Sequence, residues 1–340
     1  MTDIDIDISD ALAPDIKGRV RVTVHLPDRD LYPNPSVVCF AFPGAGYGRK
    51  YFSFSMPDDD GGQAAWHTTR GWIFVECDHL GVGDSTVPGS GVLTIAKAAI
   101  ANKVAVEAVL GMLETGGLHP GLGPVAHPIV LGMGQSMGGL VTIALQGVHR
   151  IFDGIAILGF SGMQTLLPQR PDVQEQVFPW LLRSSEGGAP IVTNGVSLES
   201  FALDPEARIG QMTYAYHDAS EPADVIEYDM LGDPASPDRA IAPWRSPTVP
   251  EYAAYGVSPG VVATEAASIT TPVLIAVGAR DVVPNPLLEP IAYRSSPDIS
   301  IYICPHMAHM HNFSPMRHAF WDRIHSWGET VAAQTAYRQP

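Results

Sequence analysis

Cysteine is scarce in this chain: its three copies, Cys39, Cys77 and Cys304, each lie inside an apolar, strand-like run. An odd count without metal-type spacing argues against both a disulfide framework and a zinc site. A nucleophilic cysteine is also disfavoured, because none of the three has the electropositive, partly exposed surroundings that stabilise a thiolate. We therefore expect three reduced core residues and no metal ion.

Basic residues are also few. The chain carries 20 Lys and Arg against 36 Asp and Glu, a formal charge of −16, and no cluster of Lys or Arg. It therefore lacks the electrostatic footprint that binds nucleic acid or an anionic membrane. No apolar run approaches the ~18 residues that span a bilayer, and the acidic residues 1–10 are the reverse of a basic secretory signal. We expect a cytoplasmic protein with no nucleic-acid or membrane partner.

Short apolar runs alternate with helical stretches along most of the chain. Strands that are apolar on both faces are typical of a parallel sheet covered by helices. A helical stripe at residues 93–113 and the alternating, half-buried pattern of an antiparallel edge strand at residues 19–24 add to this reading. The sequence predicts an α/β fold with a doubly wound sheet. The apolar runs are residues 37–42, 72–77, 129–131, 155–158, 273–277 and 299–303.

The alternation breaks between about residues 162 and 270, a region rich in proline, acids and aromatic residues. A segment of about a hundred residues between two core strands is too long for a plain loop. A chain of 340 residues suits one α/β domain with an insertion better than two unrelated domains. We predict a core formed by residues 1–161 and 269–340, and a mainly helical cap at residues 162–268.

The most informative motif is Gly134-Gln135-Ser136-Met137-Gly138, which follows a predicted strand and precedes a predicted helix. This is the G-x-S-x-G pattern of a nucleophile elbow. The sharp turn strains the backbone at Ser136, and glycine two positions before and after it removes the Cβ atoms that would clash. The free N–H groups at the start of the following helix can hold an oxyanion.

Serine needs a base within hydrogen-bond distance, and the base needs an acid to orient it. Asp281 ends a predicted strand and a glycine turn, although capping the next helix is its structural alternative. Three histidines, His306, His309 and His311, follow the last predicted strand. The resulting chain order, serine, then acid, then histidine, is the order found in α/β-hydrolases.

On these motifs, spread from about residue 20 to residue 327, the chain resembles the α/β-hydrolase fold proteins. The resemblance implies a mostly parallel central sheet flanked by helices. It also implies that His309, four residues after Pro305, is the base. His306 and His311 stay open as alternatives, with helix capping and pocket lining as their other roles. A metal site at His309 and His311 is disfavoured, because no upstream carboxylate and histidine have ligand spacing.

The loop Pro43-Gly-Ala-Gly-Tyr-Gly48 resembles the family's His-Gly-x loop. This implies that the N–H groups of Ala45 and Met137 form the oxyanion hole. An ordinary glycine-rich turn is the alternative, whereas a phosphate cradle lacks the following G-K-[ST]. Pro43 replaces the family's frequent histidine, a departure that affects hydrogen bonding around the loop. Asp78 begins a turn similar to the family's D-x-x-G-x-G-x-S, which is chiefly structural.

Serine at the elbow predicts an acyl-serine intermediate and hydrolysis of a small to medium, largely apolar carboxylic ester, with no cofactor. Lactone, thioester and C–C substrates stay open because the same triad serves them all. So do acyl transfer, perhydrolysis and a non-catalytic ligand-binding role. Trp244, Tyr252, Tyr255 and His311 are predicted to line the pocket, and residues 246–259 to form a moving lid. A homodimer is left open.

Overall fold

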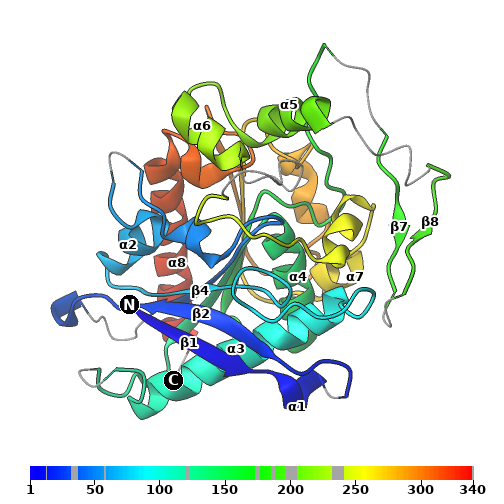
Figure 1. Ribbon diagram of the computed structural model, residues 1–340. Coiled ribbons are helices and arrows are strands. Elements are labelled where there is room, and N and C mark those ends of the chain that lie inside the picture. The colour runs from blue at the N-terminus through cyan, green and yellow to red at the C-terminus, as the bar shows by residue number, and fades with distance from the viewer. Residues whose placement is uncertain are drawn as a thin grey trace.

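The structure, a computed structural model, describes residues 1–12, 14–31, 37–56, 59–119, 122–172, 177–184, 188–196, 205–231 and 241–338. An eight-stranded sheet with the order β1-β2-β4-β3-β5-β6-β9-β10 crosses the molecule (Figure 1). The six strands from β4 to β10 in this order are parallel, as the apolar runs predicted. The strands are β1 (Thr2–Asp7), β2 (Arg19–His25), β3 (Val37–Phe42), β4 (Ile73–Cys77), β5 (Ile129–Gln135), β6 (Gly154–Leu158), β9 (Val273–Gly278) and β10 (Ile299–Cys304).

The antiparallel edge differs from the sequence prediction. Strand β2 is antiparallel as expected, but it lies between β1 and β4, so β1 forms the edge. The acidic start of the chain becomes a strand because its alternation places Ile6 in the core and aspartates on the outer face. There Asp5 accepts hydrogen bonds from the guanidinium of Arg21 on β2, which compensates for the acidic side chains.

Helices cover both faces of the sheet (Figure 1). The long helix α3 begins after Thr94, whose hydroxyl accepts a hydrogen bond from the Lys97 N–H, and it packs beside α4 on one face. Helices α2 and α8 pack together on the other face. No helix in the described part of the chain combines the length and the apolar character needed to cross a membrane. The helices outside residues 162–268 are α1 (Ser9–Leu12), α2 (Gly62–Thr68), α3 (Ile95–Thr115), α4 (Met137–His149), α8 (Arg317–Arg338) and the 3-10 turns η1 (Arg29–Leu31), η2 (Arg49–Phe52), η5 (Pro286–Ile291) and η6 (His311–Phe313).

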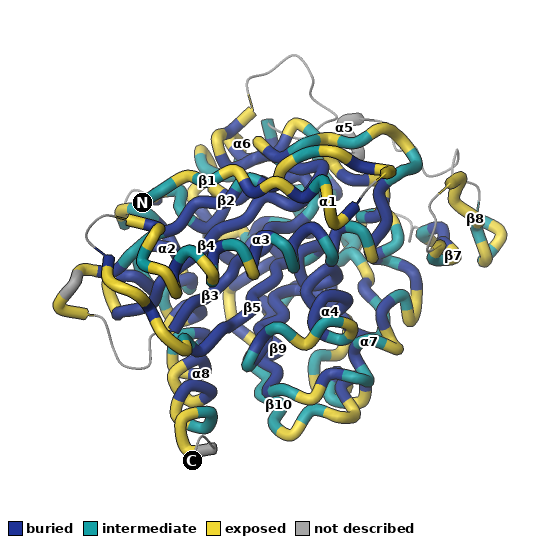
Figure 2. The backbone as a smooth tube through the Cα atoms, turned by 90° about the horizontal axis from the view of Figure 1, so that it is seen from below, coloured by how far each residue is buried: buried dark blue, intermediate teal, exposed yellow. Residues whose placement is uncertain are grey.

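Two apolar layers form the core, one on each face of the sheet. Successive residues of β3 alternate between them: Phe40 belongs to the layer under α3 and α4, and Ala41 to the layer under α2 and α8. The central strands are therefore buried along their whole length (Figure 2). The three cysteines, on β3, β4 and the edge strand β10, are buried and unpaired, as the sequence predicted. Burial raises the pKa of all three thiols.

The region predicted as a cap contains several short elements. Helices α5 and α6 lie together at the top of Figure 1, and the hairpin of β7 and β8 lies to one side. Helix α7 packs against α4 of the core, although it falls inside the predicted insertion. Residues 173–176, 185–187, 197–204 and 232–240 of the predicted cap lie outside the described residues, and the boundaries at 162 and 268 stay a prediction. The elements are β7 (Leu181–Leu182), β8 (Ile191–Val192), α5 (Pro205–Tyr216), α6 (Ala223–Met230), η4 (Glu251–Val257) and α7 (Ala263–Ser268).

Candidate active site

Ser136 lies at the sharp turn between β5 and α4 with φ 53° and ψ −118°, a left-handed conformation that is rare for a residue with a side chain. The two motif glycines are required by contact distances. A Cβ atom on Gly134 would lie 2.3 Å from the carbonyl oxygen of Gly138, and a Cβ on Gly138 would lie 2.0 Å from that of Phe42. The strained elbow expected from the sequence is therefore present, with the serine at its apex.

The three predicted triad residues meet beyond the carboxyl ends of β5, β9 and β10. His309 Nε2 lies 2.9 Å from Ser136 Oγ, and His309 Nδ1 lies 2.7 Å from Asp281 Oδ1. The Asp281 carboxylate can only accept a hydrogen bond, so His309 Nδ1 must carry a proton. His309 Nε2 then presents its lone pair to the serine hydroxyl. This is the arrangement in which imidazole removes a proton from serine.

Four donors surround the buried carboxylate of Asp281. Oδ1 accepts from His309 and from the Val282 N–H at 2.7 Å, and Oδ2 accepts from the Gly278 N–H at 2.8 Å. His311 Nε2 provides the fourth contact, 2.7 Å from Oδ2. Burial raises the pKa of Asp281, but the two histidines outweigh it and hold this pKa well below its ordinary value. The carboxylate therefore stays charged at neutral pH.

The other two histidines considered from the sequence have different positions. His306 is exposed, and His311 contacts Oδ2 of Asp281, the carboxylate oxygen that His309 does not contact. The end of α5 holds the backbone of the loop that carries His309. The N–H groups of His309 and Met310 donate to the carbonyls of Ala215 and Tyr216.

The loop of residues 43–48 approaches the elbow closely. A Cβ atom on Gly44 would lie 2.3 Å from Gln135 Oε1 and 3.1 Å from Ser136 Cβ, so a larger residue there would displace the Gln135 side chain. The carbonyl of Pro43 is 3.1 Å from His79 Nε2, and the other ring nitrogen of His79 is bonded to Asn102. Burial lowers the pKa of His79 to about 4, so this ring is neutral and donates to Pro43. His79 thus supplies a hydrogen bond to a loop in which proline replaces the expected histidine.

Asp78, at the start of the turn after β4, is fully buried and binds Arg49 through both the backbone N–H and the guanidinium. A Cβ atom on Gly83 would lie 2.5 Å from its carboxylate, which explains the glycine at that position of the turn. Asp78 is absent from the lining of the serine cavity described below. Its contacts are those of a residue that braces the loop.

A cavity of about 150 Å³ opens at Ser136. Ala45 and Met137, the predicted oxyanion-hole residues, lie in its wall beside Ser136 and His309. The remaining lining is almost entirely apolar, as is usual for a small-molecule site. It consists of Phe160, Thr165, Leu167, Tyr216, Ala253, Gly256, Val257 and Val282.

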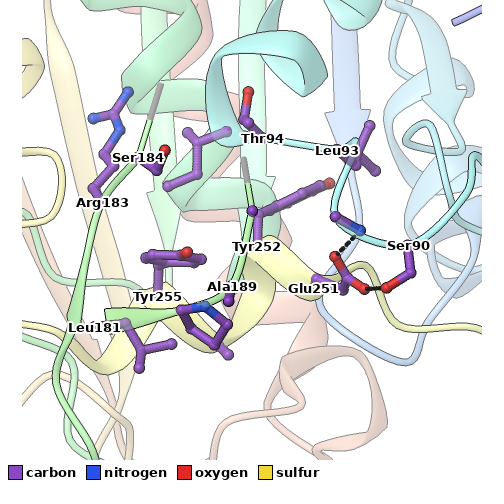
Figure 3. A pocket seen from close by; sticks show the side chains of 15 residues that line it. Ser90, Leu93, Thr94, Leu181, Arg183, Ser184, Ala189, Glu251, Tyr252 and Tyr255 are labelled. Carbon is purple, nitrogen blue, oxygen red and sulfur yellow. Dashed lines mark hydrogen bonds between the residues drawn. The ribbon is translucent and has the colours of Figure 1, made fainter. Parts of the chain in front are cut away.

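The four residues predicted to line the substrate pocket lie elsewhere around the described structure. Trp244 is buried between Phe54 and Phe313, and His311 is engaged with Asp281. Tyr252 and Tyr255 line a separate hollow of about 510 Å³ (Figure 3). The reason is geometric: both tyrosines belong to η4, whose other side, through Ala253, Gly256 and Val257, faces the serine cavity. Tyr252 and Tyr255 therefore face the larger hollow, and their neighbours on η4 face the serine cavity.

Several lining residues were not identified from the sequence. Phe160 follows β6, a parallel strand that ends at the same edge of the sheet as β5 and β9. Its position after such a strand could have indicated a place in the site. Tyr216 had no comparable signal. It ends α5, and its ring centroid lies 5.5 Å from that of His309 through folding of the region after residue 162. Among the described residues, no group of three or more His, Cys, Asp or Glu is placed to hold a metal ion.

Comparison with solved structures gives matches that cover nearly the whole chain. An esterase from Thermogutta terrifontis matches with a TM-score of 0.58 and 14% identity, covering 97% of this chain and 99% of that one. A bromoperoxidase from Bacillus anthracis matches with a TM-score of 0.60 and 13% identity, covering 98% of this chain and 100% of that one. Est816, described as an N-acyl homoserine lactone degrading enzyme, has a TM-score of 0.55 and 13% identity, covering 97% and 99%.

No protein-family model matches the sequence, and no curated protein matches it either. The likeness is therefore one of architecture, and it confirms the prediction from the sequence: the chain has the α/β-hydrolase fold. Because these three structures carry different descriptions, the fold alone selects no reaction.

Proposed function

We propose that this protein is a serine hydrolase that cleaves carboxylic esters with small acyl groups through an acyl-serine intermediate. The observation that carries the proposal is the hydrogen-bonded series from Asp281 through His309 to Ser136, which ends at a cavity walled by Ala45 and Met137. A nucleophile, a base, an orienting acid and two backbone donors are the components that acyl transfer requires.

In the proposed acylation, Ser136 Oγ attacks the ester carbonyl carbon while His309 Nε2 takes the hydroxyl proton. The carbonyl oxygen becomes an oxyanion, which the N–H groups of Ala45 and Met137 stabilise. The C–O bond to the alcohol then breaks, and His309 gives its proton to the departing alkoxide. Asp281 stabilises the imidazolium that exists between these two transfers.

Deacylation repeats the sequence with water. His309 takes a proton from water as its oxygen attacks the acyl carbon, and the second oxyanion occupies the same two donors. Ser136 departs with the proton returned from His309, which releases the carboxylic acid. A cavity lined mainly by apolar groups favours an uncharged acyl chain, since a charged one would lose its hydration without a partner.

The direct test of the proposal combines a covalent probe with a substrate. A fluorophosphonate should label Ser136 of the purified chain, as mapped by peptide mass spectrometry, and p-nitrophenyl butyrate should be hydrolysed without added metal. Absence of both labelling and hydrolysis would contradict the proposal, and labelling at another serine would contradict the assigned nucleophile.

Acyl length should have a large effect on the rate. A cavity of about 150 Å³ holds roughly a benzene-sized group, so an acetyl or butyryl chain fits and an octanoyl chain does not. We expect kcat/KM for p-nitrophenyl butyrate to exceed that for the octanoate by about 10-fold or more, as measured by steady-state kinetics on the C2 to C8 series.

A pair of neighbouring leucines provides the control. Leu167 lines the cavity, whereas Leu166 is 42% exposed and absent from the lining. Leu167→Ala should widen the cavity and raise the octanoate to butyrate ratio of kcat/KM, and Leu166→Ala should leave that ratio unchanged. A rate that rises steadily from C2 to C8 in the unmodified chain would contradict a small acyl site.

A lactone is a second candidate substrate, because one structure similar to this chain is described as a lactone-degrading enzyme. A small lactone is an uncharged internal ester of a size suited to the cavity. Titration of the acid released from γ-butyrolactone would separate the two candidates, since a lactone specialist should turn it over faster than p-nitrophenyl butyrate.

A further inference from the structure

A buried polar cluster lies against the 43–48 loop. We call it the Asp229 cluster. Its members come from the loop itself, from the turn between α5 and α6, from α6 and from the segment before η4, and each is 9% exposed or less. They are Tyr47, His217, Glu221, Asp229, Trp244 and Arg245.

The carboxylate of Asp229 is the shared acceptor. Oδ2 accepts from the Tyr47 hydroxyl at 2.6 Å and from His217 Nε2 at 3.0 Å, and Oδ1 accepts from Trp244 Nε1 at 2.6 Å. Arg245 Nε lies 3.4 Å from Oδ1 and donates to the backbone carbonyl of Asp229 at 3.0 Å. Burial raises the pKa of Tyr47 well above its ordinary value, so its hydroxyl remains a donor.

The charges of the cluster balance when His217 is protonated. Its Nδ1 contacts Glu221 at 2.6 Å, so the ring lies between two carboxylates, with Arg245 as the second cation beside Asp229. Arg280 also approaches, donating to the backbone carbonyl of His217. Burial lowers the pKa of His217, but the hydrogen bonds and charges of Asp229 and Glu221 outweigh it and raise this pKa to about 9.

This charge predicts a pH dependence of stability. A histidine with a raised folded-state pKa stabilises the fold fully below its ordinary pKa of about 6.5, and the stabilisation is lost as the pH rises through about 9. The urea midpoint of unfolding should therefore fall between pH 6.5 and 9.5, and His217→Gln should remove most of that fall. His149→Gln is the control, because the pKa of His149 is already lowered. An unchanged fall in His217→Gln would contradict a charged His217.

The cluster is tied to the loop by backbone contacts as well. The Gly48 N–H donates to the Trp244 carbonyl at 2.8 Å, and the Ser246 N–H donates to the Gly46 carbonyl at 2.9 Å. The Arg245 guanidinium lies 4.2 Å from the centroid of the Tyr47 ring. Residues 46–48 are therefore paired with residues 244–246, and Ala45 lies immediately before this paired segment.

We propose that Asp229, acting through Tyr47, is a positioning residue that fixes the oxyanion-hole N–H of Ala45. The inference rests on the proposed function. Ala45 has glycine on both sides, and glycine gives a loop little rigidity of its own. An oxyanion donor must be aimed in advance of the reaction. The Tyr47 hydroxyl, two residues away, is the loop's side-chain link to a buried carboxylate.

The expected effect falls on the chemical step. Misplacing a group by about 1 Å can cost about 100-fold in rate, so Tyr47→Phe should lower kcat by roughly 10- to 100-fold. KM should change less than about twofold, since the ground-state carbonyl depends little on these donors. The affinity for a trifluoromethyl ketone, whose adduct with Ser136 carries an oxyanion, should weaken in parallel with kcat.

The experiment compares Tyr47→Phe, Asp229→Asn and the double variant with the unmodified chain on p-nitrophenyl butyrate. Tyr293→Phe is the control, because it removes a buried hydroxyl that has no hydrogen-bond partner among the described residues. The double variant should be no slower than the slower single variant, because the contact between the Tyr47 hydroxyl and the Asp229 carboxylate is the one that both changes remove. If Asp229→Asn does not fold, Tyr47→Phe decides alone.

Hydrogen exchange of the peptide covering residues 44–48 gives a readout that does not need activity. Exchange should be faster in Tyr47→Phe than in Tyr293→Phe. Unchanged exchange, or an unchanged kcat in an active protein, would overturn the positioning role. The unmodified chain could also prove inactive and resist labelling while exchange in the loop is still faster in Tyr47→Phe. That result would contradict the proposed function and support the role of Asp229 in holding the loop.

Discussion

Replacing Ser136 by alanine should lower kcat for p-nitrophenyl butyrate by roughly 10⁴- to 10⁶-fold. The acyl-enzyme route disappears with the hydroxyl, because His309 then has no proton to remove and the ester has no nucleophile. What remains is attack by water assisted by the oxyanion donors and by binding in the cavity. KM should change little, since the hydroxyl contributes mainly in the transition state.

The controls for this variant address folding and the identity of the nucleophile. Ser136→Ala should melt at or slightly below the temperature of the unmodified chain, because the left-handed backbone at residue 136 strains both residues alike and only a hydrogen bond to His309 is lost. Iodoacetamide should not inhibit the unmodified chain, because its three cysteines are buried. Activity retained in Ser136→Ala, or lost on thiol alkylation, would remove Ser136 from the mechanism.

The sequence predicted the parts of this site that depend on local geometry. Ser136 could be found because its turn requires glycine at two fixed neighbours, and the distances at Gly134 and Gly138 show the same requirement. Asp281 could be found because it follows the buried strand β9, and parallel strands bring their carboxyl ends to one edge. Position after the last strand left three histidines open, and the family resemblance selected His309 among them.

Contacts between distant segments could not be predicted in this way. Asp229 binds Tyr47 across 182 positions of sequence, and neither residue lies in a pattern that indicates the other. The same limit applied to the pocket, where the sequence pointed to η4 but could not tell which side of a short 3-10 turn faces Ser136. The edge strand β1 was missed because its aspartates become compatible with a sheet only beside their partners on β2, where Asp5 lies opposite Arg21 and Asp7 opposite Arg19.

Asp281→Asn should be the second most damaging substitution. Each carboxylate oxygen of Asp281 accepts two hydrogen bonds, one from a histidine and one from a backbone N–H. Asparagine keeps the shape but replaces one acceptor with an NH₂ donor. Whichever way the amide is turned, its NH₂ group faces the N–H of either Gly278 or Val282. The variant therefore loses a buried hydrogen bond in both orientations and gains a repulsive contact.

The orientation decides the consequence for catalysis. With the NH₂ group toward His309, Nδ1 must accept, so Nε2 carries the proton and cannot take one from Ser136. With the NH₂ group toward His311, His309 keeps its tautomer but loses the negative charge that stabilises its imidazolium. Both outcomes slow acylation, and we expect kcat to fall about 10³- to 10⁴-fold with fluorophosphonate labelling of Ser136 slowed as well.

Asp153→Asn is the matched control for this substitution. Like Asp281, Asp153 accepts a hydrogen bond from a backbone N–H, that of Val130. Burial raises the pKa of Asp153, and this residue lies at the ends of β5 and β6 opposite to the end that carries Ser136. The control should keep kcat within about twofold, since it touches no residue of the cavity.

The low folded-state pKa of Asp281 adds a second expectation: its stabilisation is present above pH ~4 and is lost as the pH falls below that value. The asparagine variant should therefore lose less stability than the unmodified chain between pH 5 and pH 3 in urea unfolding. A kcat for Asp281→Asn within tenfold of the unmodified chain would contradict the role of this carboxylate as the orienting acid.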